Sequence, residues 1–246
     1  MRRFFTADWH LFADMVRVLG NRPFSDIYKM NSALINDANQ RANCKNCNKD
    51  VIYHIGDFFK YLSSDKVRPE QMINKIEANV ILLEGNHDPN NRVKSVAKMI
   101  VVDIGQYKNV TLSHWPSYDE ESRDFRIPCH SIHICGHVHR KFKWAYDKYR
   151  DILNINVGVD VWNYHIVSEN ELESYITSIL KNNLRDSYIG KNIHQMSPSD
   201  YVLITDCSFN NKSKTSKEKN NAKGKERPRR VRIQEDKRQK VLPLHV

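Results

Sequence analysis

Five short apolar segments of this chain end in clusters of aspartate, asparagine and histidine. Such a repeat constrains the fold strongly, because open α/β sheets bind their ligands at the carboxyl ends of strands. If the apolar segments are strands, the five loops that follow them converge on one site. The clusters are Asp8-Trp9-His10, Gly56-Asp57, Gly85-Asn86-His87-Asp88, Ser113-His114-Trp115 and Gly136-His137-Val138-His139.

The apolar segments have the length and β-branched content of strands, and helical patterns lie between them. Ser25 can cap a helix that carries Ile27, Met30, Leu34 and Ala38, and Pro69 can open a second one. Ser168 and Glu171 form a capping box before a third. The alternation predicts an α/β fold. The expected strands are Arg3–Ala7, Val51–Ile55, Val80–Leu83, Val110–Leu112, Ser131–Cys135 and Ile152–Val157.

The pattern fades after about residue 181, which divides the 246-residue chain into a main domain (1–181), a C-terminal extension (182–209) and a tail (210–246). The extension contains one further strand candidate, Tyr201–Thr205. Residues 210–240 contain 13 Lys and Arg against 4 Asp and Glu, so most of the net charge of +10 resides there. With few apolar residues to bury, this basic tail is predicted to be disordered.

Composition excludes several classes of protein. The sequence has no apolar run long enough to cross a bilayer, and its first residues do not have the pattern of a signal peptide, so we expect a cytoplasmic protein that does not contact a membrane. The five cysteines are expected to be reduced thiols. Cys44 and Cys47 form a C-x-x-C, which is a weak metal signal without a second pair of ligands.

The residue types in the five clusters are those of metal ligands. Imidazoles suit transition metals better than Mg²⁺ or Ca²⁺, and a carboxylate can be shared between two ions. In D-x-H and H-x-H the outer side chains point the same way if the backbone is extended. Glycines before Asp57, Asn86 and His137 permit tight turns or close approach of the backbone.

The ordered set D-x-H, G-D, G-N-H-D, a single H and G-H-x-H resembles the calcineurin-like metallophosphoesterases. The resemblance covers roughly residues 1–180 and keeps every ligand position. The flanking segments NRPFS, VIYHIGDFF and NVGVDVWNYHIVS are similar to a phage and bacterial subgroup of small phosphoesterases. Where related sequences have a further histidine shortly after D-x-H, this chain reads LFAD, so we expect altered substrate positioning there.

The resemblance implies a sandwich of two mixed β-sheets flanked by helices, with two metal ions at its edge. One ion would be held by Asp8, His10, Asp57 and His139. Asp57 would bridge to the second ion, which would also be held by Asn86, His114 and His137.

The family's chemistry implies roles for the other two residues of the G-N-H-D cluster. His87 would face the leaving-group oxygen as a general acid or charge stabiliser, and Asp88 would orient His87 or its loop. A hydroxide that bridges two ions ~3.5–4 Å apart would attack the phosphorus directly. Mn²⁺ is the first choice of ion, with Mg, Fe, Zn, Co or Ni as alternatives.

Three arginines lie near the clusters, and at least one of them is expected to clamp substrate phosphate: Arg22, Arg92 and Arg140. Other residues beside the clusters are expected to be structural or exposed. His54 should form a hydrogen bond within the scaffold, and His130, His133 and His165 are not expected to be catalytic. Trp9 and Trp115 are expected to be packing residues.

The substrate class follows less directly from the sequence. The chain has no large insertion that would build a protein-docking surface, so we expect a small phosphoester, first of all a nucleotide such as a (deoxy)nucleoside 5′-monophosphate. The alternative is a phosphodiesterase or nuclease acting on cyclic nucleotides or nucleic acid, with the basic tail as a tether. A binding protein that has lost catalysis would lack a ligand or His87, and neither is missing.

Overall fold

The computed structural model describes residues 1–42, 50–60, 67–119, 126–182 and 204–205. Three predictions concern residues outside these ranges: the Cys44–Cys47 pair, most of the C-terminal extension and the disordered basic tail. The chain divides into two compact units, Met1–Asn211 and Lys212–Val246, and all described residues belong to the first. Among the described residues, no helix has the length and apolar character of a membrane span.

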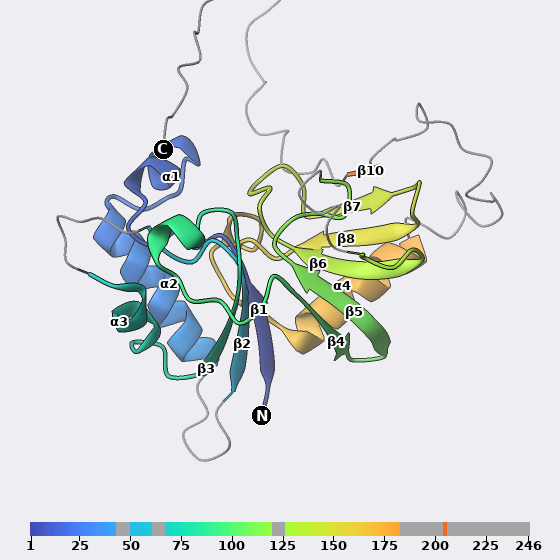
Figure 1. Ribbon diagram of the computed structural model, residues 1–246, viewed down its shortest axis with the longest axis horizontal. Helices are drawn as coiled ribbons and strands as arrows, with labels where there is room; N and C mark the ends of the chain where they lie inside the picture. The colour runs from blue at the N-terminus through green and yellow to red at the C-terminus, as the bar shows by residue number, and fades with distance from the viewer. Residues whose placement is uncertain (43–49, 61–66, 120–125, 183–203, 206–246) are drawn as a thin grey trace, which may run out of the picture. The chain divides into compact units, whose positions relative to one another are not determined.

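The first sheet has four strands in the order β3-β2-β1-β9, of which β1, β2 and β3 are labelled in Figure 1. The three longer strands are parallel, and β9 is antiparallel to β1. Phe4 pairs with Ile52 in this register, so the strands begin at one end of the sheet and their carboxyl ends meet at the other. The strands are β1 (Arg3–Thr6), β2 (Val51–Ile55), β3 (Asn79–Leu83) and β9 (Val167–Ser168).

The second sheet has six strands in the order β10-β7-β8-β6-β5-β4. Its central strands β5, β6 and β8 are parallel, whereas β4, β7 and β10 are antiparallel to their neighbours. Two mixed sheets with helices confirm the predicted α/β fold. The strands are β4 (Met99–Ile104), β5 (Tyr107–Ser113), β6 (Ser131–Cys135), β7 (Trp144–Asp147), β8 (Ile152–Asn156) and β10 (Ile204–Thr205).

Four α-helices and two short 3₁₀ helices complete the described part. Pro69 opens α3, and the Ser168–Glu171 capping box before α4 is present, as predicted. Asp26 rather than Ser25 caps α2, since its carboxylate accepts the amide of Lys29. The α-helices are α1 (Asp14–Leu19), α2 (Ile27–Arg41), α3 (Pro69–Ile73) and α4 (Glu169–Asn182), and the 3₁₀ helices are η1 (Pro89–Asn91) and η3 (Val159–Val161).

Two apolar clusters hold these layers together. Between the sheets, Phe5 and Leu83 of the first sheet pack with Leu112 and Ile155 of the second, and α4 contributes Ile176. The opposite face of the first sheet packs against α2 and α3. Each fully buried side chain of this size contributes about 1.5–3 kcal/mol. The sandwich therefore fixes where the carboxyl ends of both sets of parallel strands lie.

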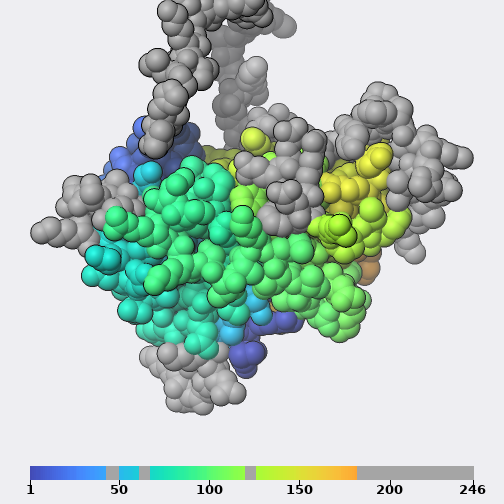
Figure 2. Space-filling model, viewed as in Figure 1, coloured from blue at the N-terminus to red at the C-terminus, as the bar shows by residue number. Residues whose placement is uncertain are grey.

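Three strands, β4, β7 and β9, are not predicted from the sequence above. β7 reads Trp-Ala-Tyr-Asp and β9 has two residues, so neither shows a strand periodicity. β4 contains Ile100, Val101 and Val102, a β-branched run that is typical of a strand. In the space-filling view, the part of the chain that includes the β4–β5 pair and the loop after β3 covers the middle of this face, in green (Figure 2).

Candidate metal centre

The five polar clusters all follow the carboxyl ends of parallel strands. Asp8, Asp57 and Asn86 come after the neighbouring strands β1, β2 and β3, and His114 and His137 come after β5 and β6. An isolated bridge between Ala7 and Gly158 brings the loop after β8 to the same place. The structure therefore brings together residues that lie far apart in the sequence, such as Asp8 and His137, which are 129 positions apart.

The backbone of this site is strained rather than extended. Five of the seven candidate ligands have positive φ angles, which cost non-glycine residues free energy and are common at functional sites. An extended backbone, the condition under which the outer side chains of D-x-H and H-x-H would point the same way, is therefore not met. Left-handed backbone conformations direct the side chains of these five ligands instead. The angles are Asp8 59°, His10 49°, Asp57 57°, His137 69° and His139 48°.

Hydrogen bonds between side chains and backbone join the loops to one another. The amide of His137 donates to Asp8 Oδ1 at 3.0 Å, and the amide of His87 donates to Asp57 Oδ1 at 2.9 Å. Each carboxylate thus uses one oxygen to hold a neighbouring loop. The second oxygen of Asp8 has no hydrogen-bond partner among the described residues, and the second oxygen of Asp57 lies beside His10 and His114.

Two glycines are required by this close packing of loops. Gly56 has a φ of +84°, and a Cβ atom there would lie 2.5 Å from His114 Nδ1. A Cβ atom on Gly85 would lie 2.3 Å from Asp57 Oδ1. Gly56 therefore allows the tight turn before Asp57, and Gly85 allows the backbone before Asn86 to approach Asp57 closely, as expected.

One group of candidate ligands consists of Asp8, His10 and His139, and its chemistry fits a cation. Asp8 Oδ2 and His10 Nε2 are buried and have no hydrogen-bond partner among the described residues. A buried polar atom without a partner costs free energy that a bound cation would recover. The rings of His10 and His139 stack with centroids 5.1 Å apart.

A second group gathers around Asp57. Asp57 Oδ2 lies 3.3 Å from His114 Nε2 and 3.5 Å from His10 Nε2. Asn86 Oδ1 lies 3.0 Å from both His114 Nε2 and His137 Nδ1. Ligand atoms of Asp8, Asp57 and His114 all lie within 4.8 Å of one another, as do those of Asp8, His10 and His139. The two groups are contiguous, which is the arrangement that two neighbouring ions require.

The hydrogen bonds of two histidines decide which ring nitrogen is available to an ion. His114 Nδ1 donates to the carbonyl of Ile55 at 2.9 Å, and His139 Nδ1 donates to Asp160 Oδ2 at 2.8 Å. In each ring Nε2 is then the nitrogen left to bind an ion, which would take the place of any proton on it. Partners of this kind are common behind metal-bound histidines and raise their basicity.

The charges at the site also favour a cation. Burial raises the pKa of Asp8. Burial would raise the pKa of Asp57 as well, but His114 and His10 outweigh it and hold that pKa well below its usual range. Burial would lower the pKa of His114, but the Asp57 carboxylate raises it to about 9. His114 thus carries a proton that a bound cation would replace.

Asp160 is a site residue that the sequence did not indicate. It lies in η3 and its side chain is 1% exposed. One carboxylate oxygen accepts from His139, and both oxygens pair with Arg22 at 2.8–2.9 Å. No motif marks an aspartate 21 residues after its histidine, so only the fold reveals this contact.

Arg22 does not face the site, contrary to the expectation that it is a candidate phosphate clamp. Its side chain is fully buried, and its donors bind Asp160 and the carbonyls of Asp8 and Trp9. Arg140, in contrast, is 44% exposed at the edge of the site. Arg92 is exposed in the loop after η1, with a φ of 61°. The two exposed arginines remain candidates for phosphate binding.

Asp88 supports its loop and has no hydrogen bond to the ring of His87. Its carboxylate accepts the amides of Asp57, Phe58 and Gly85 at 2.8–3.0 Å and is fully buried. Of the two roles that the resemblance implied, the geometry fits orientation of the loop. Asp88 is therefore a positioning residue for the turn that carries Asp57.

The other histidines in the described part of the chain lie outside the site. His133 is buried between Ser113 and Asn154, and His130 and His165 are exposed partners of aspartates. His54 packs edge-on against the rings of Trp9 and Phe58. The expected hydrogen bond of His54 is wrong, since neither of its ring nitrogens has a partner among the described residues. Trp9 and Trp115 are buried, as expected of packing residues.

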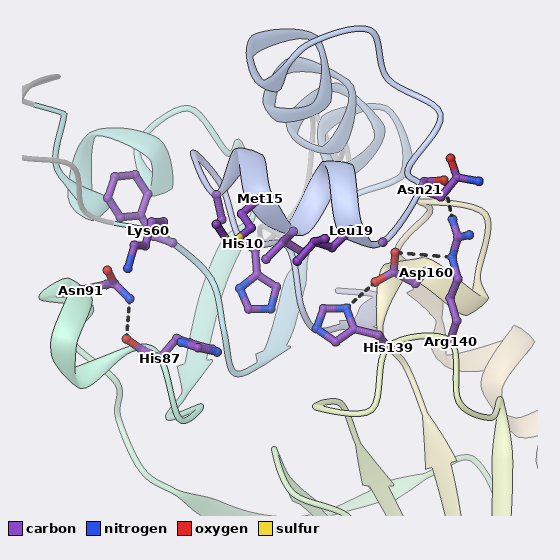
Figure 3. Close-up of a pocket in the computed structure, with 14 residues that line it drawn as sticks. His10, Met15, Leu19, Asn21, Lys60, His87, Asn91, His139, Arg140 and Asp160 are labelled. Atoms are coloured by element: carbon purple, nitrogen blue, oxygen red, sulfur yellow. Dashed lines mark hydrogen bonds and ion pairs between the residues drawn. The ribbon is translucent and has the colours of Figure 1, made fainter.

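A cavity of about 630 Å³ opens beside the first group of ligands (Figure 3). His10, His87 and His139 line one side of it, and α1 lines the opposite side with Met15, Val16 and Leu19. Lys60 and Arg140 lie at its two ends. This volume is in the range of pockets that bind small molecules.

Known proteins resemble this chain in sequence and fold. An uncharacterised protein from Methanocaldococcus jannaschii is 31% identical over 149 residues, which cover 60% of this chain and 76% of that protein. The crystal structure of a protein of unknown function from Aquifex aeolicus superposes with a TM-score of 0.51 at 20% identity, covering 71% of this chain and 98% of that one. The second likeness concerns the fold alone.

The sequence pattern of the calcineurin-like phosphoesterase superfamily domain matches residues 7–166. The match spans more than half of the chain and includes all five polar clusters. Members of this family depend on a pair of metal ions and hydrolyse phosphoesters, which agrees with the two contiguous groups of ligands. The chain therefore belongs to the calcineurin-like phosphoesterase superfamily.

Proposed function

We propose that this protein is a phosphomonoesterase that acts on small nucleotides, such as (deoxy)nucleoside 5′-monophosphates. The observation that carries the proposal is the cavity, because it joins the histidines of the candidate metal centre to a largely apolar wall. A phosphate can lie at the histidines while the rest of a small ester occupies the cavity. The choice of deoxynucleotides rests on the flanking segments, which are similar to phage and bacterial phosphoesterases.

The chain's own residues would hold two ions in this proposal. Asp8, His10, Asp57 and His139 would bind one, and Asp57, Asn86, His114 and His137 would bind the other. What two divalent ions supply in such a site is an activated water and neutralisation of charge on phosphate. Asn86 contributes an oxygen without adding negative charge against the incoming anion. Mn²⁺ is the first choice, because histidine-rich sites favour transition metals.

His87 is assigned the proton transfer to the leaving group. Its side chain is 55% exposed and lines the cavity, and its Nε2 lies 4.0 Å from Asp57 Oδ2. The loop is held at both sides of this residue, because the His87 amide donates to Asp57 and its carbonyl accepts from Asn91 at 2.6 Å. The ring is therefore positioned at the cavity, where it can donate to a departing alkoxide.

A phosphodiesterase or nuclease is the alternative reaction, and it is distinguished by the substrate. The purified protein is assayed with Mn²⁺ on deoxynucleoside and ribonucleoside monophosphates, a bis-aryl phosphodiester and single-stranded DNA. We expect hydrolysis of the monophosphates, and a loss of at least about 100-fold in Asp57→Asn, which lacks the shared carboxylate. Cleavage of the diester but not of the monoesters would reverse the order of the two proposals. Full activity of Asp57→Asn would refute the two-metal reaction.

A further inference from the structure

We propose that α1 is the element that recognises the leaving group, and that Met15, Val16 and Leu19 bind the face of a nucleoside. This inference rests on the proposed function and names the surface that would select the substrate. It concerns a segment with no ligand motif, the helix that follows the D-x-H cluster.

The first argument is the exposure of apolar side chains on α1. The helix has six residues, and none of them is buried. Met15 is 73% exposed and Leu19 is 78% exposed. Single exposed apolar residues are common, but several on one short helix form a patch that is typical of binding surfaces. α1 thus presents apolar surface where a folded core would normally cover it.

The second argument is the direction of this surface. Met15, Val16 and Leu19 have the i, i+1, i+4 spacing of one helix face, and all three line the cavity. Figure 3 shows Met15 above His10 and Leu19 above His139. Val18 is 57% exposed on the same helix but does not line the cavity. The apolar face is therefore directed at the candidate metal centre.

The third argument is that α1 is held in place by specific contacts. The amide of Lys60 donates to the carbonyl of Leu11 at 2.7 Å, which joins the start of this segment to the loop after β2. Arg17 pairs with Asp14 and donates to the carbonyl of Phe24 at 3.0 Å. Arg140 donates to the carbonyl of Asn21 at 3.1 Å, just after the helix. The apolar wall that α1 forms is therefore fixed at both ends, so it can select a leaving group by its shape.

The fourth argument identifies the occupant. Lys60 and Arg140 attract an anion, and the histidines provide the place for its phosphate. Buried Phe59 and Asn91 support the cavity from behind, where the Asn91 amide donates to the His87 carbonyl, and exposed Asn21 lines the cavity. An apolar wall with cationic side chains at its ends and the amide of Asn21 fits a base and sugar better than an acyl chain, which uses no polar group. The volume of about 630 Å³ is in the range of pockets that hold one small molecule of the size of a nucleoside.

The binding test does not depend on turnover. Metal-free protein is labelled with [methyl-¹³C]methionine and titrated with deoxyadenosine, with glycerol as the control ligand. We expect the Met15 methyl resonance to shift saturably with deoxyadenosine and not with glycerol. The resonances of buried Met30 and Met72 should stay in place. A Met15 resonance that does not move, or that moves with all the others, overturns the inference.

A kinetic test uses a matched pair of variants on the same helix. Leu19→Ala should raise the KM for deoxyadenosine monophosphate about tenfold, since it removes an apolar contact of the leaving group without adding charge. It should lower kcat/KM for the nucleotide at least about fivefold more than for glycerol 3-phosphate, which has no base to contact the helix. Val18→Ala should show no such difference between the two substrates. Equal effects of the two variants on the nucleotide would overturn the inference.

The two tests separate this inference from the proposed function. A wild-type protein that hydrolyses no monoester but shows the Met15 shift refutes the proposed reaction and keeps the binding surface. Hydrolysis of nucleotides without a Met15 shift refutes the role of α1 and keeps the reaction.

Discussion

The carboxylate of Asp160 joins Arg22 to His139. His139 Nδ1 donates to it at 2.8 Å, and Arg22 forms two hydrogen bonds to it from a fully buried position. Burial would raise the pKa of Asp160, but His139 and Arg22 outweigh it and lower that pKa to about 2. The carboxylate is therefore charged at neutral pH and fixes the ring of His139.

Asp160→Asn tests this positioning role. Removal of one partner from a buried ion pair leaves Arg22 uncompensated, so the free energy of unfolding should fall by about 3–5 kcal/mol. The affinity of His139's site for Mn²⁺ should fall about 10–100-fold, because the ring loses its orienting acceptor. Calorimetric titration of the folded variant with Mn²⁺ measures the second effect. Exposed Asp103 provides the matched control, Asp103→Asn, for which both quantities should stay unchanged.

His87→Ala separates the chemistry from metal binding. The side chain is more than half exposed and is not among the proposed ligands, so the variant should fold and bind two ions per chain. Its kcat should fall about 10²–10⁴-fold, which is the contribution of a positioned general acid. Asn86→Ala should instead lose affinity for one ion, because Asn86 lies between His114 and His137. Metal content by mass spectrometry distinguishes the two, and loss of an ion in His87→Ala would contradict the assignment.

Asp88→Asn should destabilise the loop that carries Asp57. The carboxylate accepts three backbone amides, and the NH₂ group of asparagine would face at least one of these donors. We expect a loss of about 2–4 kcal/mol in urea unfolding of the metal-free protein, as buried donors lose a charged acceptor. An unchanged unfolding midpoint would show that the three amides find other partners.

The stability of the metal-free protein should fall between pH 6.5 and pH 4. Burial lowers the pKa of His54 to about 3 and that of His133 to about 4. Both are neutral when folded and titrate near 6.5 when unfolded, so the unfolded chain binds more protons as the pH falls through this range. At pH 4.5 each of these two histidines should lower the free energy of unfolding by about 3 kcal/mol relative to its value at pH 7.

His54→Phe checks the pH dependence directly. Phenylalanine keeps the ring packed against Trp9 and Phe58 and removes two nitrogens that have no hydrogen-bond partner among the described residues. Denaturant unfolding at several pH values should give a shallower decline than in the wild type. Parallel curves for the two proteins would contradict a neutral, buried His54.

Much of the fold could be predicted because its signals are local. β2 and β6 have the predicted bounds, and Pro69 opens α3 as expected. α1 is not predicted, since a six-residue helix without a buried residue has no core-facing stripe to reveal it. Short strands such as β9 exist only because a neighbouring strand accepts their hydrogen bonds.

The sequence by itself determined which chemical groups stand at the strand ends. Residue types and their places after apolar segments predict carboxylate, amide and imidazole ligands, and the fold needs only to bring the strand ends together. Tertiary structure alone decided how these groups are held, through contacts between distant residues. Arg22 and Asp160 are 138 positions apart in the sequence. Their contact keeps the Arg22 side chain buried, away from the cavity, and the same carboxylate orients His139. Burial and backbone turns, which no local pattern encodes, determine which side chains face the cavity and which support it from behind.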